Sequence, residues 1–106
     1  MRKIAFSGFM WDEANGHKCQ SHGVSISEIE FVLAHAESLI VPDLKNSQVE
    51  SRLLAIGRTQ KGRYIFVVFT PRKNLGATLL RPISARYMHQ KEIEKYEQEI
   101  ARTKKR

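Results

Sequence analysis

The order of apolar and polar positions predicts a strand and two helices in the first third of the chain. Phe6–Trp11 has the character of a short strand, and the polar stretch after it predicts a helix that Asp12 caps and His22–Gly23 ends. Ser25 and Glu28 form a capping box at the start of a second helix. Apolar residues then follow at helical spacing, so we expect one face of this helix to pack on the core. These residues are Ile26, Ile29, Val32, Leu33 and Ala36.

Three strand-like segments joined by short turns follow in the middle of the chain. The strands are Glu50–Arg58, Arg63–Thr70 and Ala77–Ser84, and the turns between them are Gln60–Gly62 and Pro71–Gly76. The second of these strands is the most apolar and β-branched, which predicts a central strand covered on both faces. Pro82 indicates an end or an edge in the third strand, because proline has no N–H to donate to a ladder.

A loop and a last helix complete the pattern. Val41–Ser47 is rich in loop-forming residues, and residues 88–103 predict a helix. Its apolar stripe consists of Met88, Ile93, Tyr96 and Ile100. A basic tail that frays is expected from about residue 102. The order β-α-α-β-β-β-α predicts an α+β fold with helices packed against an antiparallel sheet, and a length of 106 residues supports a single domain over residues 1–106.

Basic residues are concentrated in the second half of the chain. Residues 1–57 contain five basic and seven acidic side chains, whereas residues 58–106 contain thirteen basic and four acidic ones. The segment from Arg58 to Lys91 holds eight basic residues and no acidic one. Solvated surfaces usually mix both signs, so this segregation favours a nucleic acid or an acidic protein as the partner.

The chain has neither a long apolar segment nor a cysteine pair. Its longest apolar run, Tyr64–Phe69, is far shorter than the roughly 20 residues that cross a bilayer, and no apolar stretch of signal-peptide length follows the first residues. Cys19 is the only cysteine, so an internal disulfide is excluded and we expect a small, partly buried thiol. These features predict a cytoplasmic protein.

Short motifs from about Phe9 to Tyr96 resemble, in their order, the BrnT toxin family. The first motifs are Trp11-Asp12, Asn15, Lys18-Cys19-Gln20 and His22-Gly23-Val24-Ser25. The later ones are Arg52, Ile56-Gly57-Arg58, Gly62-Arg63 before the strand that ends at Thr70, the run from Arg81 to Arg86, Glu92 and Tyr96. The resemblance implies a RelE-like fold and a metal-independent endoribonuclease without a cofactor. It also implies neutralisation by a BrnA-type antitoxin with a ribbon-helix-helix DNA-binding domain.

RNA cleavage without a metal needs a base for the 2′-OH, a cation for the phosphorane and an acid for the leaving 5′-oxygen. Arginine suits the cation because its planar fork grips two oxygens, and histidine carries protons near neutral pH. The candidate catalytic residues are Lys18, His22, Arg58, Arg72 and Arg86. The candidate RNA-binding residues are Lys61, Arg63, Tyr64, Lys73, Arg81, Tyr87 and His89. The expected product is a 2′,3′-cyclic phosphate, with mRNA as the expected substrate.

Several candidates have a structural alternative. Lys18 and His22 are four residues apart, so they share a face if both lie on a helix. In that arrangement we expect Lys18 to lower the pKa of His22. The alternative is that His22 only caps the helix. Arg86 is expected at the junction of the last strand and helix, where it binds RNA or pairs with Glu92. Tyr64 and Tyr87 are expected either to stack on unpaired RNA bases or to lie in the core. Arg58 is expected to be more exposed than Arg52, the other arginine of the same predicted strand.

A metal site is not expected. His17, Cys19 and His22 are possible zinc ligands, but only Cys19 and His22 have a helical spacing, and further ligands must come from afar. Two other functions remain open. The first is a non-catalytic module that docks nucleic acid or an acidic protein, and growth arrest on expression without antitoxin separates it from an enzyme. The second is a toxin of the same fold with a target such as a topoisomerase, and RNA integrity during arrest distinguishes it.

Overall fold

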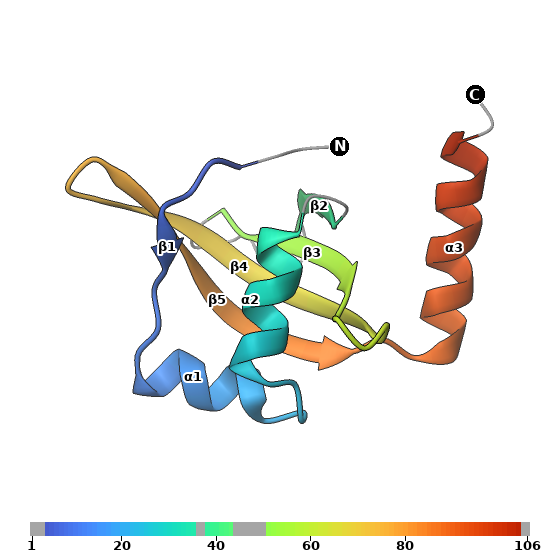
Figure 1. The fold of residues 1–106 in the computed structure, drawn as a ribbon, viewed down its shortest axis with the longest axis horizontal. Helices are drawn as coiled ribbons and strands as arrows, with labels where there is room; N and C mark the ends of the chain where they lie inside the picture. Colours follow the sequence, from blue (N-terminus) through green and yellow to red (C-terminus); the bar gives the residue numbers. More distant parts are fainter. Residues whose placement is uncertain (1–3, 36–37, 44–50, 105–106) are drawn as a thin grey trace.

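The computed structural model describes residues 4–35, 38–43 and 51–104 of the chain. It confirms the predicted α+β class, with three helices and a sheet of five strands in this part of the chain (Figure 1). The strands are β1 (Gly8–Phe9), β2 (Leu39–Pro42), β3 (Leu53–Arg58), β4 (Tyr64–Asn74) and β5 (Ala77–Tyr87). The helices are α1 (Glu13–Gln20), α2 (Ile26–Ala34) and α3 (Gln90–Lys104).

The strands form one sheet in the order β1-β5-β4-β3-β2. Neighbouring strands are antiparallel except β1, which lies parallel to β5 with Gly8 opposite Leu79. The sheet is therefore mixed, whereas the pattern predicted an antiparallel one. The strands β2 to β5 follow one another in the chain and pair antiparallel with their neighbours, whereas β1 is separated from its partner β5 by most of the chain and is under no such constraint.

β2 is a strand at the point where the pattern predicted the start of a loop. Leu39–Pro42 pairs with Leu53–Ile56 of β3, so the loop prediction was wrong for Val41 and Pro42. The apolar residues Leu39, Ile40 and Val41 pair with the apolar strand β3 and so add one strand to the sheet. Pro42 is tolerated because β2 is the edge strand. Residues 44–47 of the predicted loop lie outside the described part of the chain.

β4 is central, as predicted, but only one of its faces is fully buried. Ile65, Val67 and Phe69 have no exposed surface and belong to the core, which α1 and α2 help to enclose. The alternate residues Phe66 and Val68 are only half-buried. The prediction of cover on both faces was wrong because, in the described structure, α2 packs on the core face of β4, whereas α3 meets the other face at Tyr64, at the start of the strand.

The hairpin between β4 and β5 projects from the body as a two-stranded arm (Figure 1). The pattern predicted a turn over Pro71–Gly76, but β4 runs on to Asn74 and the turn is confined to Leu75 and Gly76. Both turn residues have left-handed φ values, of +51° and +85°. Proline does not end β4 here because, among the described strands, β3 pairs with β4 only as far as Phe69.

Pro82 lies inside β5 and not at the strand end or sheet edge that the pattern indicated. The ladder between β4 and β5 is irregular at Val68/Phe69, opposite this proline. Bulges of this kind accept a residue that cannot donate to the ladder. The carbonyl of Pro82 accepts a hydrogen bond of 2.8 Å from the side chain of Asn15, which ties α1 to the sheet.

The predicted starts of the first two helices are confirmed. The side chain of Asp12 accepts from the N–H of Asn15 at 3.0 Å, and the hydroxyl of Ser25 accepts from the N–H of Glu28 at 3.1 Å. Both caps are reciprocal capping boxes. The turn after α1 includes Gly23 with a φ of +89°, which agrees with its predicted role at the end of this helix.

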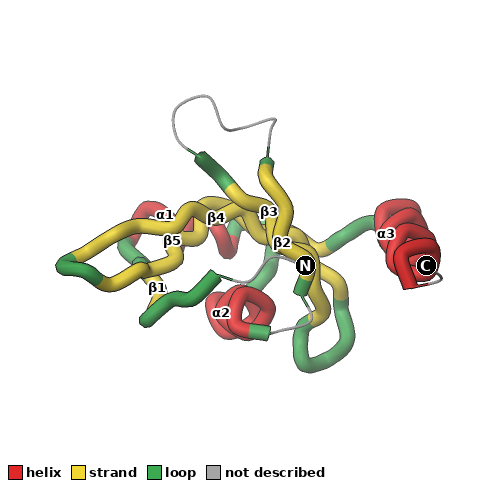
Figure 2. Tube along the Cα trace, turned by 90° about the horizontal axis from the view of Figure 1, so that it is seen from above, coloured by secondary structure: helices red, strands yellow, loops and turns green. Residues whose placement is uncertain are grey.

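α3 stands beside the sheet instead of packing over it (Figure 2). The predicted apolar stripe is present, since Met88 is buried and Ile93, Tyr96 and Ile100 are half-buried. α3 begins beyond the end of β5 and contacts the sheet at its end, where Tyr96 meets Tyr64 and Glu92 pairs with Arg86.

The last helix continues to Lys104, and residues 105–106 of the predicted basic tail lie outside the described part of the chain. Within the described residues, no helix has the length and apolar character that a membrane span requires.

Candidate nucleic-acid interface

The turn between β3 and β4 lies between two adjoining pockets. The tight turn predicted at Gln60–Gly62 is confirmed. The N–H of Thr59 donates to the carbonyl of Arg63 at 2.8 Å, and the N–H of Gly62 donates to the carbonyl of Thr59 at 2.9 Å. Gly62 has a φ of +87°, a conformation that favours glycine. These bonds fix the backbone of the turn that carries Lys61 and Arg63.

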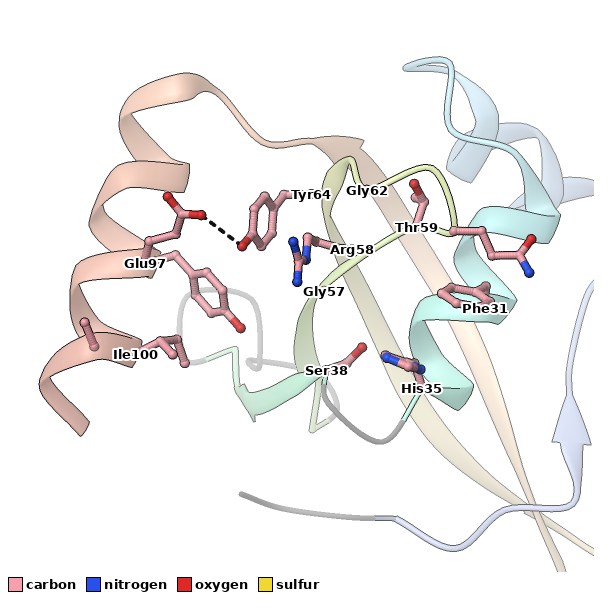
Figure 3. Close-up of a pocket in the computed structure, with 13 residues that line it drawn as sticks. Phe31, His35, Ser38, Gly57, Arg58, Thr59, Gly62, Tyr64, Glu97 and Ile100 are labelled. Carbon is pink, nitrogen blue, oxygen red and sulfur yellow. Dashed lines mark hydrogen bonds between the residues drawn. The ribbon is translucent and has the colours of Figure 1, made fainter. Parts of the chain in front are cut away.

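The larger pocket is a groove of about 930 Å³ that reaches from α2 past the end of β3 to α3 (Figure 3). Phe31 and His35 form one wall, and their rings stack with centroids 5.3 Å apart. Tyr96 and Glu97 of α3 form the opposite wall. Arg58 lies between the two walls, where its guanidinium is accessible to a ligand.

Arg58 is supported by an aromatic pair. Its guanidinium carbon lies 5.5 Å from the centre of the Tyr64 ring, and Tyr96 meets Tyr64 edge-on with centroids 5.5 Å apart. The Tyr64 hydroxyl donates to Glu97 at 3.2 Å. Burial and this hydrogen bond raise the pKa of Tyr64, so the phenol stays protonated at neutral pH. The groove thus presents the Arg58 guanidinium beside a phenol whose proton is donated to Glu97.

The smaller pocket has a volume of about 400 Å³ and lies on the other side of the turn. Lys61, Arg63 and Tyr87 line it, and the guanidinium of Arg63 stacks 3.5 Å above the Tyr87 ring. The Tyr87 hydroxyl donates to Glu28 at 2.9 Å. Burial opposes ionisation of Glu28, but hydrogen bonds from Ser25 and Tyr87 outweigh it and lower the pKa of this carboxyl. Glu28 is therefore a fixed acceptor that positions the tyrosine.

The structure brings five of the predicted site residues to this turn and places the others elsewhere. The five are Arg58, Lys61, Arg63, Tyr64 and Tyr87. Arg72 and Lys73 lie on the exposed arm, where the Lys73 ammonium donates to Thr78 at 2.7 Å. Arg81 pairs with Asp12 at 3.0 Å and so joins β5 to the start of α1.

α1 ends before His22, so the predicted helical pairing of Lys18 and His22 is wrong. The helix stops at Gln20, and His22 lies in the turn that follows. The side chains of Lys18 and His22 are both exposed. This turn nevertheless approaches the smaller pocket, because the Tyr87 hydroxyl lies 3.5 Å from the carbonyl of Gly23.

Arg86 is the second-to-last residue of β5, so it lies at the predicted junction of the last strand and the last helix. It donates two hydrogen bonds of 2.9 and 2.8 Å to Glu92, and its guanidinium lies 4.6 Å from the centre of the Phe66 ring. The pairing with Glu92 that the sequence left open is therefore present. The strand register places Arg86 and Arg58 on the same face of the sheet, because their partners Phe66 and Tyr64 are two residues apart.

Glu92 fixes the start of α3. Besides its bonds to Arg86, it accepts a hydrogen bond of 2.8 Å from the N–H of His89, whose side chain is exposed. The Arg86 side chain, followed by the His89 backbone, lowers the pKa of Glu92 from 4.5 to about 2. The carboxylate thus links the last strand to the last helix.

The lowered pKa predicts an acid-sensitive contribution to stability. Glu92 takes up a proton more readily in the unfolded chain, so the stabilisation is present above pH 4.5 and is lost as the pH falls towards 2. We expect Glu92→Gln to lower the melting temperature at about pH 7 and to differ little from the wild type near pH 2. Thermal unfolding at several pH values measures this difference. A difference that does not change with pH would contradict the assignment.

Four residues beside the turn were not predicted as site residues. They are Glu28, His35, Tyr96 and Glu97. From the sequence, Glu28 was identified only as a helix cap and Tyr96 only as part of a stripe and motif. His35 follows the apolar face of α2 and belongs to no motif. Only the packing of α2 beside β3 and the placement of α3 bring these residues to the turn.

The structure gives no support to a zinc site at the end of α1. Among the described residues, no cluster of three histidine, cysteine or acidic side chains could hold a metal ion. Cys19 is fully buried, and burial raises the pKa of its thiol to about 11. Because metal ligation requires the thiolate, a buried neutral thiol is a poor ligand.

Comparison with known proteins identifies the family. Residues 11–92 match the model of the family described as "Ribonuclease toxin, BrnT, of type II toxin-antitoxin system". No curated protein matches the chain. The matched segment covers most of the chain. It contains the capped helices α1 and α2, the β3–β4 turn, and Glu92 at the start of α3, which pairs with Arg86. The resemblance seen in the sequence motifs is confirmed, and the chain belongs to the BrnT family of ribonuclease toxins of type II toxin–antitoxin systems.

Proposed function

We propose that this chain is a metal-independent endoribonuclease that cleaves mRNA in the cytoplasm and thereby stops translation and growth. The observation that carries the proposal is the position of Arg58, which lies in an open groove between aromatic walls at the β3–β4 turn. A guanidinium in this position grips phosphate oxygens with its planar fork and remains charged at every pH of interest. Family membership supplies the reaction class, and this groove supplies a place for it.

The two pockets suit a single RNA strand that crosses the turn. They share Phe31, Thr59 and Gln60, so they form one continuous path around the tip of the hairpin. Basic side chains at the turn neutralise the backbone phosphates. The stacked Arg63 and Tyr87 present a planar surface to a base, as proteins that bind unpaired RNA commonly do.

The reaction we propose is an internal transesterification. The 2′-oxygen attacks the adjacent phosphorus, the bond from phosphorus to the 5′-oxygen breaks, and the products are a 2′,3′-cyclic phosphate and a 5′-hydroxyl. Arg58 stabilises the charge of the phosphorane, and Tyr64, whose hydroxyl donates to Glu97, supports the guanidinium with its ring. We propose that histidine accepts the proton of the 2′-OH and supplies the proton that the leaving 5′-oxygen takes up. The candidates are His35, which lines the groove with Arg58, and His22, which lies next to Gly23 beside the smaller pocket.

The remaining basic candidates have positions that suit substrate contacts farther along the RNA. Arg72 and Lys73 lie on the arm, and Arg81 lies near its base. His89 and Lys18 are exposed at the start of α3 and on α1. We propose that these residues contact backbone phosphates, whereas Arg86 acts mainly through its pairing with Glu92.

Membership in a type II system means that the toxin has an antitoxin protein as its partner. We propose a BrnA-type antitoxin with a ribbon-helix-helix DNA-binding domain, in a hetero-oligomeric complex with this chain. The net charge of +7 supports an acidic binding region in that partner.

The proposed activity is tested by incubating the purified chain with RNA in excess EDTA. We expect fragments that end in a 2′,3′-cyclic phosphate, detected by mass spectrometry. Cleavage that stops with the chelator and returns with a divalent ion would contradict the metal-independent mechanism. Intact RNA under all conditions, with bound chain, would instead indicate a non-catalytic module.

A further inference from the structure

The face of the sheet opposite α2 carries apolar side chains at positions where a solvated antiparallel sheet normally carries polar ones. We call this surface the outer sheet face. It consists of Leu39 and Val41 of β2, Leu54 and Ile56 of β3, and Phe66 and Val68 of β4. The register places these residues directly opposite one another across the three strands, so they form one continuous patch.

All six side chains of the outer sheet face are half-buried, whereas their neighbours Ala55, Ile65 and Val67 on the other face have no exposed surface. In the described part of the chain, α2 packs on the other face, α1 packs on β5, and α3 stands beside the sheet (Figure 2). Among the described residues, no helix therefore forms a layer over the outer sheet face. A contiguous apolar surface of this kind marks a protein interface.

We propose that the antitoxin covers the outer sheet face with an apolar segment flanked by acidic residues. The toxin belongs to a two-protein system, so a dedicated protein partner exists. An apolar patch suits a protein segment and not the phosphate backbone of RNA. The exposed Arg58 lies on the same face as Ile56, because the two are separated by one residue in β3, and it provides a basic edge for the acidic flank.

The position of the outer sheet face also accounts for inhibition. Tyr64 and Phe66 alternate along β4 on this face, so a segment seated over Phe66 lies next to the groove of Arg58 and Tyr64. The bound antitoxin therefore shields the proposed RNA site. The inference rests on the proposed antitoxin partnership but not on the cleavage mechanism, so it can be tested without measuring cleavage.

The test uses single-cysteine labelling. Cys19 is the only cysteine and is fully buried, so it gives little background with a maleimide. Val68→Cys places a thiol in the outer sheet face with little change in volume. Leu75→Cys places one at the tip of the arm, where the native side chain is fully exposed, and serves as the matched control. Each variant is labelled free and in complex with the antitoxin of the same toxin–antitoxin pair, after its melting temperature has been measured.

We expect the antitoxin to slow labelling at Val68→Cys by about tenfold or more and to leave Leu75→Cys unchanged. Val68→Glu should also weaken antitoxin binding by about tenfold or more, whereas Leu75→Glu should not. Equal labelling of Val68→Cys in the free and bound states would overturn the proposal. The proposal would also be overturned if the thiol of Val68→Cys were already fully protected in the free chain. The same holds if RNA or self-association, and not the antitoxin, protected it. Protection by the antitoxin in a chain that cleaves no RNA would retain this inference and reject the enzymatic proposal.

Discussion

Replacing Arg58 with alanine is expected to slow RNA cleavage by about 10²–10³-fold, the usual effect of removing one donor to a developing oxyanion. Arg58 lies in the groove between α2 and α3 and is not enclosed in the core. The melting temperature should therefore change little. Cleavage rate and thermal unfolding measured on the same preparation separate a loss of catalysis from a loss of folding.

Two further variants sharpen this prediction. Arg58→Lys keeps the charge but loses the fork, so we expect a rate between those of the wild type and the alanine variant. Arg102 on α3 is an exposed arginine that pairs with Glu99, and it serves as the control for the loss of one positive charge. A full cleavage rate in Arg58→Ala, or an equal loss in Arg102→Ala, would remove Arg58 from the proposed site.

The second large effect is expected at the residue that transfers protons. Loss of a general acid or base typically slows a reaction by about 10²–10⁴-fold. The sequence motifs favoured His22, whereas the geometry favours His35, because His35 lines the same groove as Arg58. We expect His35→Ala to show this loss with little change in RNA affinity, and His22→Ala to show the smaller loss.

His35→Gln is the matched control for packing. It keeps a polar side chain of similar reach beside Phe31 but cannot carry a proton at neutral pH. If His35 transfers protons, the alanine and glutamine variants are equally slow, whereas a packing role predicts that glutamine restores the rate. The larger loss in His22→Ala would return the proton-transfer role to the motif histidine.

The local features of the fold could be predicted because they depend on a few neighbouring residues. Ser25 and Glu28 cap α2 whatever surrounds them, and Gly62 permits the tight turn through its own backbone freedom. The features that were missed depend on contacts between distant segments. β2 forms because β3 offers it an apolar edge, and Pro82 is tolerated because the β4–β5 ladder is irregular beside it.

The residues of the candidate site also divide into those that the local sequence predicts and those that only contacts between distant segments bring together. Arg58, Arg63 and Tyr64 could be predicted because they flank a recognisable turn in a basic segment. His35 and Glu97 could not, because the groove that they line is formed by segments far apart in the sequence. The Tyr64–Glu97 bond joins residues 33 positions apart, and only the placement of α3 beside the end of the sheet creates it.

The central claim is that RNA binds across the β3–β4 turn. The most direct test records amide chemical shifts of the chain while RNA with 2′-O-methyl groups is added, because this RNA lacks the nucleophile and stays intact. We expect the largest changes at residues 58–64 and at Tyr87, with smaller changes at the arm residues Arg72 and Lys73. Changes confined to the arm or to α1, with the turn unaffected, would contradict the central claim.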